Sequence, residues 1–242
     1  NLCKDNFRGT LRKAVFSMNK IAEQTLITLI DQLRDTHLLS KEEWMFLIEN
    51  RTRDVSEYLF SQAREVRHQH YGHDVYIRGL IEFTNYCKND CIYCGIRKSN
   101  LNACRYRLSE TDIQNCCRTG YELGFRTFVL QGGEDGWFTD QKIISLIEKI
   151  KTDFPDCAIT LSIGEKERES YQAFFDAGAD RYLLRHETYN STHYGKLHPP
   201  ALTAAHRQRC LYDLKEIGYQ TGTGFMVGSP YQTAEHLAED IL

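Results

Sequence analysis

The sequence predicts an α/β fold with parallel strands, a TIM-type (βα) barrel preceded by a helical N-terminal extension. From residue 75 onward, short β-branched or aromatic runs alternate with helical segments. Helical crossovers of this length favour parallel strands. Polar side chains end several of these runs, as at the carboxyl rim of a barrel, where barrel enzymes place their chemistry. These side chains are Glu82, Gln131, Glu165 and Glu187.

The first 72 residues show no strand pattern and predict three helices. Residues 19–34 carry apolar side chains at helical spacing. Ser40 opens a capping box for a second helix that continues through Ile48. A third helix is expected over residues 53–70. We expect residues 1–72 to form a helical extension packed on the main domain, which would cover residues 73–242.

Five strands are predicted in the main domain, with helices between them. Ser109, Thr139 and Thr233 suit helix N-caps, and Gly124, Gly178 and Gly218 suit helix ends. A parallel barrel of five strands is open, so we expect it to be incomplete at the C-terminus. Because the fifth strand would be an unpaired edge, we expect this chain alone to aggregate or be inactive. The predicted strands are Val75–Thr84, Arg126–Leu130, Ala158–Ile163, Arg181–Leu184 and Gln220–Val227.

Composition excludes several classes of function. The 242 residues include 30 Lys and Arg against 33 Asp and Glu, a net charge of −3. This balance gives no electrostatic basis for binding nucleic acid or an anionic membrane. No apolar run approaches the ~18 residues of a membrane helix, and no signal peptide is evident. The nine cysteines are an odd number and unevenly placed, which argues against a disulfide framework and for a reducing, cytoplasmic location.

Three cysteines directly follow the first predicted strand. Cys87, Cys91 and Cys94 have the spacing Cys-x3-Cys-x2-Cys, with Tyr93 before the last. Neighbouring thiolates on one loop can converge on a metal. Structural zinc requires four ligands, and no second Cys-x2-Cys pair completes such a site. A 4Fe–4S cluster held by three cysteines keeps one iron open for another ligand. Zinc completed by a distant histidine, and inert buried thiols, remain as alternatives.

This cysteine motif resembles the signature of the radical S-adenosylmethionine (SAM) superfamily, whose enzymes use a partial or full parallel barrel. The resemblance implies that Cys87, Cys91 and Cys94 hold a 4Fe–4S cluster. It also implies that the amino and carboxylate groups of SAM chelate the open iron. One electron from a low-potential donor would then cleave SAM to methionine and a 5′-deoxyadenosyl radical.

The resemblance extends to the ends of the later strands. A Gly-Gly-Glu stretch at residues 132–134 lets the backbone approach a ligand and offers a carboxylate to an ammonium group. Charged residues in the fourth strand favour a liganded interior, with an internal salt-bridge network as the alternative. The two arginines of the predicted interior make an anionic substrate plausible. The implied SAM-binding residues are Tyr93, Gln131, Gly132, Gly133, Glu134, Glu187, Arg207 and Met226, and the implied substrate-lining residues are Thr160, Ser162, Arg181 and Arg185.

Within the superfamily, the sequence most resembles the HydE family of FeFe-hydrogenase maturases, with methylornithine synthase and biotin synthase as relatives. The resemblance covers roughly residues 20–242 and is strongest over residues 179–188. It implies a role in forming the dithiomethylamine-bridged diiron part of the H-cluster. The implied substrate is a small anionic or organometallic compound, and the implied partners are other hydrogenase maturases. The alternatives are a methylornithine- or biotin-synthase-like reaction on a small organic substrate and, more distantly, a non-catalytic zinc-binding module.

The other cysteines and a histidine group carry no predicted chemistry. Free cysteines are commonly buried as small apolar side chains. Histidines at the end of a helix are favourable there without a metal. The residues concerned are Cys104, Cys116, Cys117, Cys157 and Cys210, and His68, His70 and His73.

Overall fold

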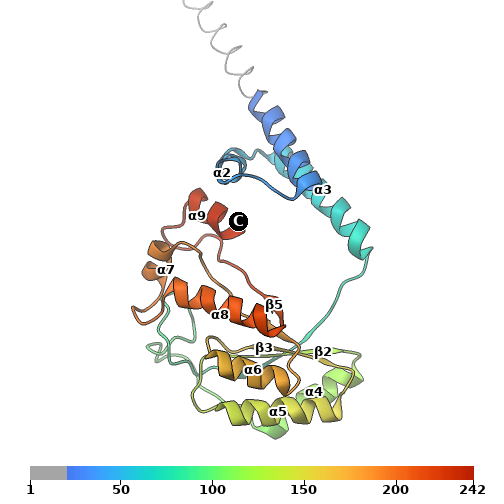
Figure 1. The fold of residues 1–242 in the computed structure, drawn as a ribbon, viewed down its shortest axis with the longest axis vertical. Coiled ribbons are helices and arrows are strands. Elements are labelled where there is room, and N and C mark those ends of the chain that lie inside the picture. The colour runs from blue at the N-terminus through green and yellow to red at the C-terminus, as the bar shows by residue number, and fades with distance from the viewer. Residues whose placement is uncertain (1–20) are drawn as a thin grey trace, which may run out of the picture. The chain divides into compact units, whose positions relative to one another are not determined.

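A computed structural model describes residues 21–242 (Figure 1). Its main feature is a five-stranded parallel sheet in which the strands follow one another in chain order. This sequential order is that of a (βα) barrel wall, and among the described residues β1 and β5 each pair with one strand only. The predicted α/β fold, an incomplete barrel, is therefore confirmed. The strands are β1 (Gly79–Thr84), β2 (Thr127–Gly132), β3 (Ala158–Ser162), β4 (Arg181–Leu183) and β5 (Gln220–Gly222).

Every crossover between these strands contains a helix (Figure 1). Ser109 forms a full capping box, because its hydroxyl accepts from the Asp112 N–H at 3.1 Å. Gly178 and Gly218 follow their helices with φ of +113°, a backbone conformation that glycine adopts without strain. The predicted starts and ends of these helices are thus borne out. The helices are α4 (Glu110–Glu122), α5 (Asp140–Asp153), α6 (Arg168–Asp176), α7 (Ser191–Leu197) and α8 (Ala204–Ile217).

The strands divide their side chains between an apolar and a polar face. Because successive side chains in a strand point to opposite faces, alternate residues of each strand share one face. Phe128, Leu130, Ile159, Leu161 and Tyr182 are fully buried, and they form one core with side chains from α4, α5, α6 and α8. The intervening positions carry most of the polar side chains, among them Gln131, Thr160 and Ser162, together with a few apolar ones such as Val129. One face of the sheet is therefore covered by helices, and the opposite face is left to build a site.

Two predicted strands are shorter than the sequence suggests by four or more residues, whereas β3 and β4 each end one residue early. The first begins at Gly79 instead of Val75, since Gly79 pairs with Phe128 and β2 offers only Thr127 before that position. Val75 is accordingly 79% exposed. The fifth ends at Gly222 instead of Val227, because β4 has only three residues to pair with it. Beyond that point a single bridge, from Glu187 to Phe225, continues the pairing.

The remaining helices form a second compact unit with its own core. They are a helix that covers residues 21–36 of the described chain, α2 (Lys41–Asn50), α3 (Arg53–Tyr71) and α9 (Ala234–Ile241). The main unit covers Tyr76–Gln232, whereas Thr233–Leu242 groups with the residues up to Val75. The prediction assigned residues 233–242 to the main domain. Lys41 Nζ lies 2.7 Å from carboxylate oxygens of both Glu235 and Glu239, which ties α9 to α2.

Residues 19 and 20, the start of the first predicted helix, lie outside the described residues, as does Cys3. Within residues 21–242, none of the helices combines the length and apolar composition that crossing a bilayer requires.

Candidate active site

A cavity of about 350 Å³ opens at the carboxyl ends of strands β1 to β4. Glu82, Gln131 and Ser162, which stand at or next to strand ends, contribute to its wall. The loop after β1 contributes Tyr93 and Cys94 to the same wall. The cavity is therefore the place where the sheet's polar face meets the cysteine motif.

Residues predicted for three different roles meet at this cavity. The cysteine motif supplies one predicted cluster ligand and its neighbouring aromatic residue. The predicted SAM-binding and substrate-lining sets each supply further members. Those that line the cavity are Cys94 and Tyr93, then Gln131, Gly132, Glu187 and Arg207, and then Ser162 and Arg185.

The three cysteines lie on residues 85–106, here called the cysteine loop. Cys87, Cys91 and Cys94 are free and half-buried. Burial, against an opposing hydrogen bond from Tyr93 and together with the nearby Cys87 and Cys94, raises the pKa of the Cys91 thiol to about 11. Across residues 21–242, no group of three or more His, Cys, Asp or Glu side chains is arranged as a ready-made metal site. Three thiols from one loop, close enough to perturb one another, still suit the three-cysteine ligand set of an iron–sulfur cluster.

Arg105 ties the cysteine loop together, a role that the sequence did not reveal. Its half-buried guanidinium donates to the carbonyls of Ile96 at 2.8 Å, Arg97 at 2.7 Å and Asn100 at 3.2 Å. It also donates to the carbonyl of Asn85, at the other end of the loop. No motif marks such an arginine, because its partners are backbone groups that every residue possesses.

The Gly-Gly-Glu stretch packs beneath the cysteine loop. A Cβ on Gly133 would lie 2.2 Å from the Tyr86 carbonyl oxygen and 2.8 Å from the Cys87 Cβ. The Lys88 N–H donates to the carbonyl of Glu134 at 3.0 Å, which fastens the loop to this stretch. Glycine at position 133 therefore allows the end of β2 to approach the first cysteine.

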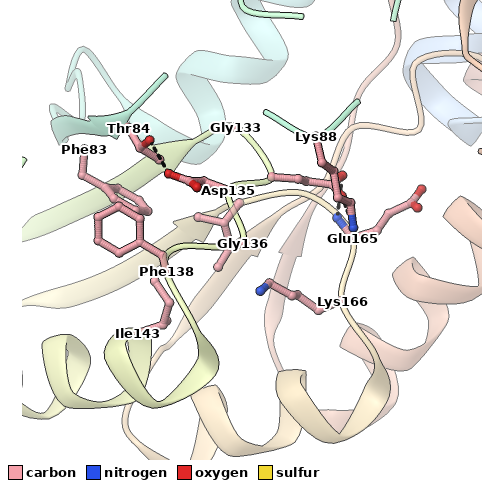
Figure 2. A pocket seen from close by; sticks show the side chains of 12 residues that line it. Phe83, Thr84, Lys88, Gly133, Asp135, Gly136, Phe138, Ile143, Glu165 and Lys166 are labelled. Carbon is pink, nitrogen blue, oxygen red and sulfur yellow. Dashed lines mark hydrogen bonds and ion pairs between the residues drawn. The ribbon is translucent and has the colours of Figure 1, made fainter. Parts of the chain in front are cut away.

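Glu134 lines a smaller neighbouring cavity of about 80 Å³. Gly133, labelled in Figure 2, lines the same cavity. The carboxylate is buried, and its Oε1 accepts from the Glu165 N–H at 3.1 Å. Its Oε2 lies 3.2 Å from Lys88 Nζ, an ion pair whose geometry is not that of a hydrogen bond. This buried oxygen thus keeps capacity to accept hydrogen bonds from an ammonium group. Figure 2 also shows Thr84 bonded to Asp135 at the edge of this cavity.

Arg207 lines the larger cavity and Glu165 the smaller one, and the two form a buried ion pair. Arg207 Nε lies 2.5 Å from Glu165 Oε1, and both residues are 8% exposed. A second guanidinium nitrogen, Nη1, donates to the carbonyl of Arg185 at 2.8 Å. The guanidinium of Arg207, which the resemblance assigned to SAM binding, is therefore already paired with the carboxylate of Glu165.

Glu187 has a left-handed backbone, with φ of +66°, which is costly for a residue with a side chain. Its N–H donates to the carbonyl of Gly224 at 3.1 Å, and its own carbonyl accepts from the Met226 N–H at 3.0 Å. Burial raises the pKa of the Glu187 carboxyl, although Arg207 and Arg185 oppose the shift. Met226 is placed beside Glu187 through this backbone bond but does not line the cavity.

Thr160 and Arg181 line a separate cavity of about 280 Å³, together with Arg78 and Gln220. They pair with each other in the sheet, below the strand ends. The Arg181 guanidinium donates to the Thr127 hydroxyl at 3.1 Å and also contacts the Gln220 side chain. Both partners are neutral, so the salt-bridge network considered for this strand does not form at Arg181.

Two further residues of the cavity wall, Glu82 and Asn85, were given no binding role in the prediction. Glu82 accepts from Gln131 Nε2 at 2.9 Å through its side chain, and its carbonyl accepts from the Tyr106 hydroxyl at 2.9 Å. Asn85 bonds both Tyr106 N–H and the Cys104 carbonyl. The polarity of the strand end had marked Glu82, whereas nothing marked Asn85.

The prediction that the other cysteines are buried is wrong for Cys104 and Cys116, which are exposed. Cys104 belongs to the cysteine loop, outside any helix–sheet interface. Cys116 and Cys117 are adjacent on α4 and so face different directions, of which only that of Cys117 meets the core.

Residues 81–242, which include the cysteine loop, the cavity and α9, match the family model of the radical SAM superfamily. The chain belongs to the radical SAM superfamily. In general, members of this superfamily use a 4Fe–4S cluster and SAM. Membership in this superfamily explains the cysteine spacing from which the resemblance was inferred, and the parallel fold agrees with it.

Among curated proteins, the chain is similar to the [FeFe] hydrogenase maturase subunit HydE of Thermotoga maritima. The two are 44% identical over 190 residues, which are 78% of this chain and 54% of that protein. It is also similar to 3-methylornithine synthase of Methanosarcina acetivorans, at 27% identity over 87% of this chain and 60% of the relative. The chain thus spans somewhat more than half the length of the curated relatives it matches.

Solved structures agree on the fold. The methylornithine synthase PylB superposes with a TM-score of 0.80 at 26% identity, over 88% of this chain and 62% of that one. The hydrogenase maturase HydG superposes with a TM-score of 0.79 at 22% identity, over 95% of this chain and 53% of that one. The second likeness shows only a shared fold.

Proposed function

We propose that this chain is the cluster- and SAM-binding part of an enzyme that acts in FeFe-hydrogenase maturation. The observation that carries the proposal is the meeting of Tyr93 and Cys94 with Gln131, Glu187 and Arg207 at one cavity. The 44% identity to HydE supports hydrogenase maturation as the process.

The chain's own residues suit both cofactors. Cys87, Cys91 and Cys94 would hold the 4Fe–4S cluster, and the residues predicted for SAM would hold that molecule between the cluster and the strand ends. When bound, this pair of cofactors supplies the one-electron reductive cleavage of the SAM sulfonium. The electron would come from a low-potential donor, and other hydrogenase maturases would be partners.

A buried carboxylate of the neighbouring smaller cavity suits the ammonium end of a bound amino acid. The free capacity of Glu134 Oε2 suits an ammonium group. Glu165 and Arg207 neutralise each other, so the pair adds no net charge between the two cavities. Glu187 is partly desolvated, which strengthens any hydrogen bond that it accepts from a ligand. The protein's contribution is therefore to bind, orient and exclude water.

Arg185 supports an anionic or organometallic substrate. It lines the cavity, it is exposed, and its guanidinium has no hydrogen bond or ion pair among residues 21–242. Such a guanidinium can bind an anion in a bidentate manner, through two parallel N–H hydrogen bonds. Ser162 would line the same space, whereas Thr160 and Arg181 would act from the separate cavity below.

Anaerobic reconstitution with iron and sulfide tests the cofactor assignment, using the protein as it occurs in the cell. We expect a reducible cluster whose electron paramagnetic resonance spectrum changes when SAM is added, and SAM cleavage under reduction. Cys91→Ala should lose both, whereas Cys116→Ala, at an exposed cysteine outside the site, should keep both. Stoichiometric zinc without iron uptake would support a zinc-binding module instead.

The likeness to methylornithine synthase favours a second reaction of the same class on a small organic substrate. Assays of the loaded protein with each class of substrate separate the two. Support for hydrogenase maturation would be restored hydrogenase activity in cells that lack their own HydE. Conversion of a basic amino acid without such complementation would favour the second reaction.

A further inference from the structure

Helix α7 and the residue after it hold the middle of the cysteine loop. The last carbonyls of a helix lack partners within the helix. At the end of α7, the Leu197 carbonyl accepts from the Ile92 N–H at 3.0 Å. Ile92 stands between the second and third cysteines, so a helix end that precedes α8 is fastened to the centre of the cysteine motif.

His198, the residue that follows α7, makes a second contact with the same part of the loop. Its Nε2 lies 2.8 Å from the Tyr93 hydroxyl, and the two rings meet edge to face at 5.3 Å between centroids. Its Nδ1 lies 2.9 Å from the Tyr194 carbonyl oxygen, and the Tyr194 ring stacks on the imidazole at 3.7 Å. The imidazole is thus held on its face and at both nitrogens.

These contacts define which nitrogen carries the proton. A carbonyl only accepts, so Nδ1 must donate to Tyr194. In a neutral imidazole, Nε2 is then the acceptor, and the Tyr93 hydroxyl donates to it. His198 is 5% exposed, and burial lowers its pKa to about 4, a direction that Arg207 and His193 reinforce. The neutral ring required for the Tyr93 bond is therefore the form present near pH 7.

We infer that His198 is a positioning residue, which holds Tyr93 and with it the segment from Cys91 to Cys94 against the cavity. Tyr93 and Cys94 both line that cavity, so their placement sets how the cysteine loop meets a ligand there. The consequence for SAM rests on the proposed function, whereas the consequence for the loop itself does not.

Cysteine accessibility tests the inference without any cofactor. In the metal-free protein, alkylation of each cysteine by iodoacetamide is followed by peptide mass spectrometry. His198→Phe keeps a ring but removes the acceptor, and Tyr93→Phe removes the donor. Each should speed alkylation of Cys91 and Cys94 about tenfold, the equivalent of one buried hydrogen bond. Alkylation of Cys116 should stay unchanged, as should all rates in Tyr212→Phe, at a tyrosine that is 68% exposed.

Two further variants separate positioning from general loosening. The double variant should resemble the single ones, because both remove the same bond. His198→Gln, whose amide oxygen can accept from Tyr93, should restore most of the protection. Unchanged alkylation in both single variants, or additive effects in the double variant, would overturn the inference.

The loaded protein gives a separate reading. Once iron content is shown to be equal, His198→Phe should weaken SAM binding about tenfold in a titration followed by the cluster's spectrum. If wild-type protein takes up no cluster, the proposed function fails while the alkylation result still decides the inference. If the cluster assembles but the SAM affinity of His198→Phe matches wild type, Tyr93 does not transmit its position to the ligand, and this part of the inference is rejected.

Discussion

Replacing Gly133 with alanine tests how closely the end of β2 must approach the cysteine loop. The new Cβ would lie 2.2 Å from the Tyr86 carbonyl oxygen and 2.8 Å from the Cys87 Cβ. The first of these atoms belongs to the backbone, so it cannot rotate away as the end of a long side chain can. Either the loop or the end of the strand has to move.

The size of the effect follows from these distances. Ordinary contact begins at 3.4 Å, so the two segments must separate by roughly 1.2 Å. Overpacking of this kind costs about 1–3 kcal/mol of the free energy of unfolding. For a domain of this size, that corresponds to a fall of about 2–12 °C in the melting temperature. Because Cys87 touches the new methyl group, cluster binding should suffer more than stability does.

The assay compares Gly133→Ala with Gly136→Ala, where a Cβ would meet nothing within 4 Å. Iron and sulfide per chain are measured after anaerobic reconstitution, and thermal unfolding is followed by circular dichroism. We expect a lower melting temperature and a clear loss of iron for Gly133→Ala, with Gly136→Ala close to wild type. Equal iron content and equal melting temperatures in the two variants would refute the reasoning.

Three other outcomes follow from the contacts. Arg207→Met should lower the free energy of unfolding, measured in urea, by about 3–5 kcal/mol, because it leaves the Glu165 carboxylate buried without its cation. Adding Glu165→Gln should recover most of that loss, and no recovery would contradict the pairing. Arg105→Met should speed proteolysis within residues 85–105, measured by mass spectrometry, because it removes the hydrogen bonds to loop carbonyls. A cleavage pattern like that of wild type would argue against the stabilising role of Arg105 in the loop. The free energy of unfolding should fall by about 3 kcal/mol as pH drops from 6.5 to about 4. In this range the histidine is protonated in the unfolded state, whereas the buried His198 of the folded state stays neutral. His198→Phe should flatten this dependence in urea titrations at stepped pH, and an identical slope in both proteins would exclude His198 as its source.

Local features of the chain were accessible to prediction because their signals are short. A capping box spans four residues, and the motif from Cys87 to Cys94 spans eight. Strand–helix alternation likewise depends on side-chain periodicity within each segment. The parallel fold, the helix starts and the family membership therefore came from sequence. The limits of β1 and β5 did not, since a strand extends only as far as its neighbour offers partners.

The sequence by itself determined which chemistry is available here, through three thiols on one short loop and polar residues at strand ends. Only the tertiary structure decided how those groups are held. Arg207 meets Glu165 across 42 positions, Tyr93 meets His198 across 105, and Lys41 meets Glu235 across 194. The physical reason is that such pairs depend on the register of the sheet and the course of its crossovers. No local pattern in the chain records either of them.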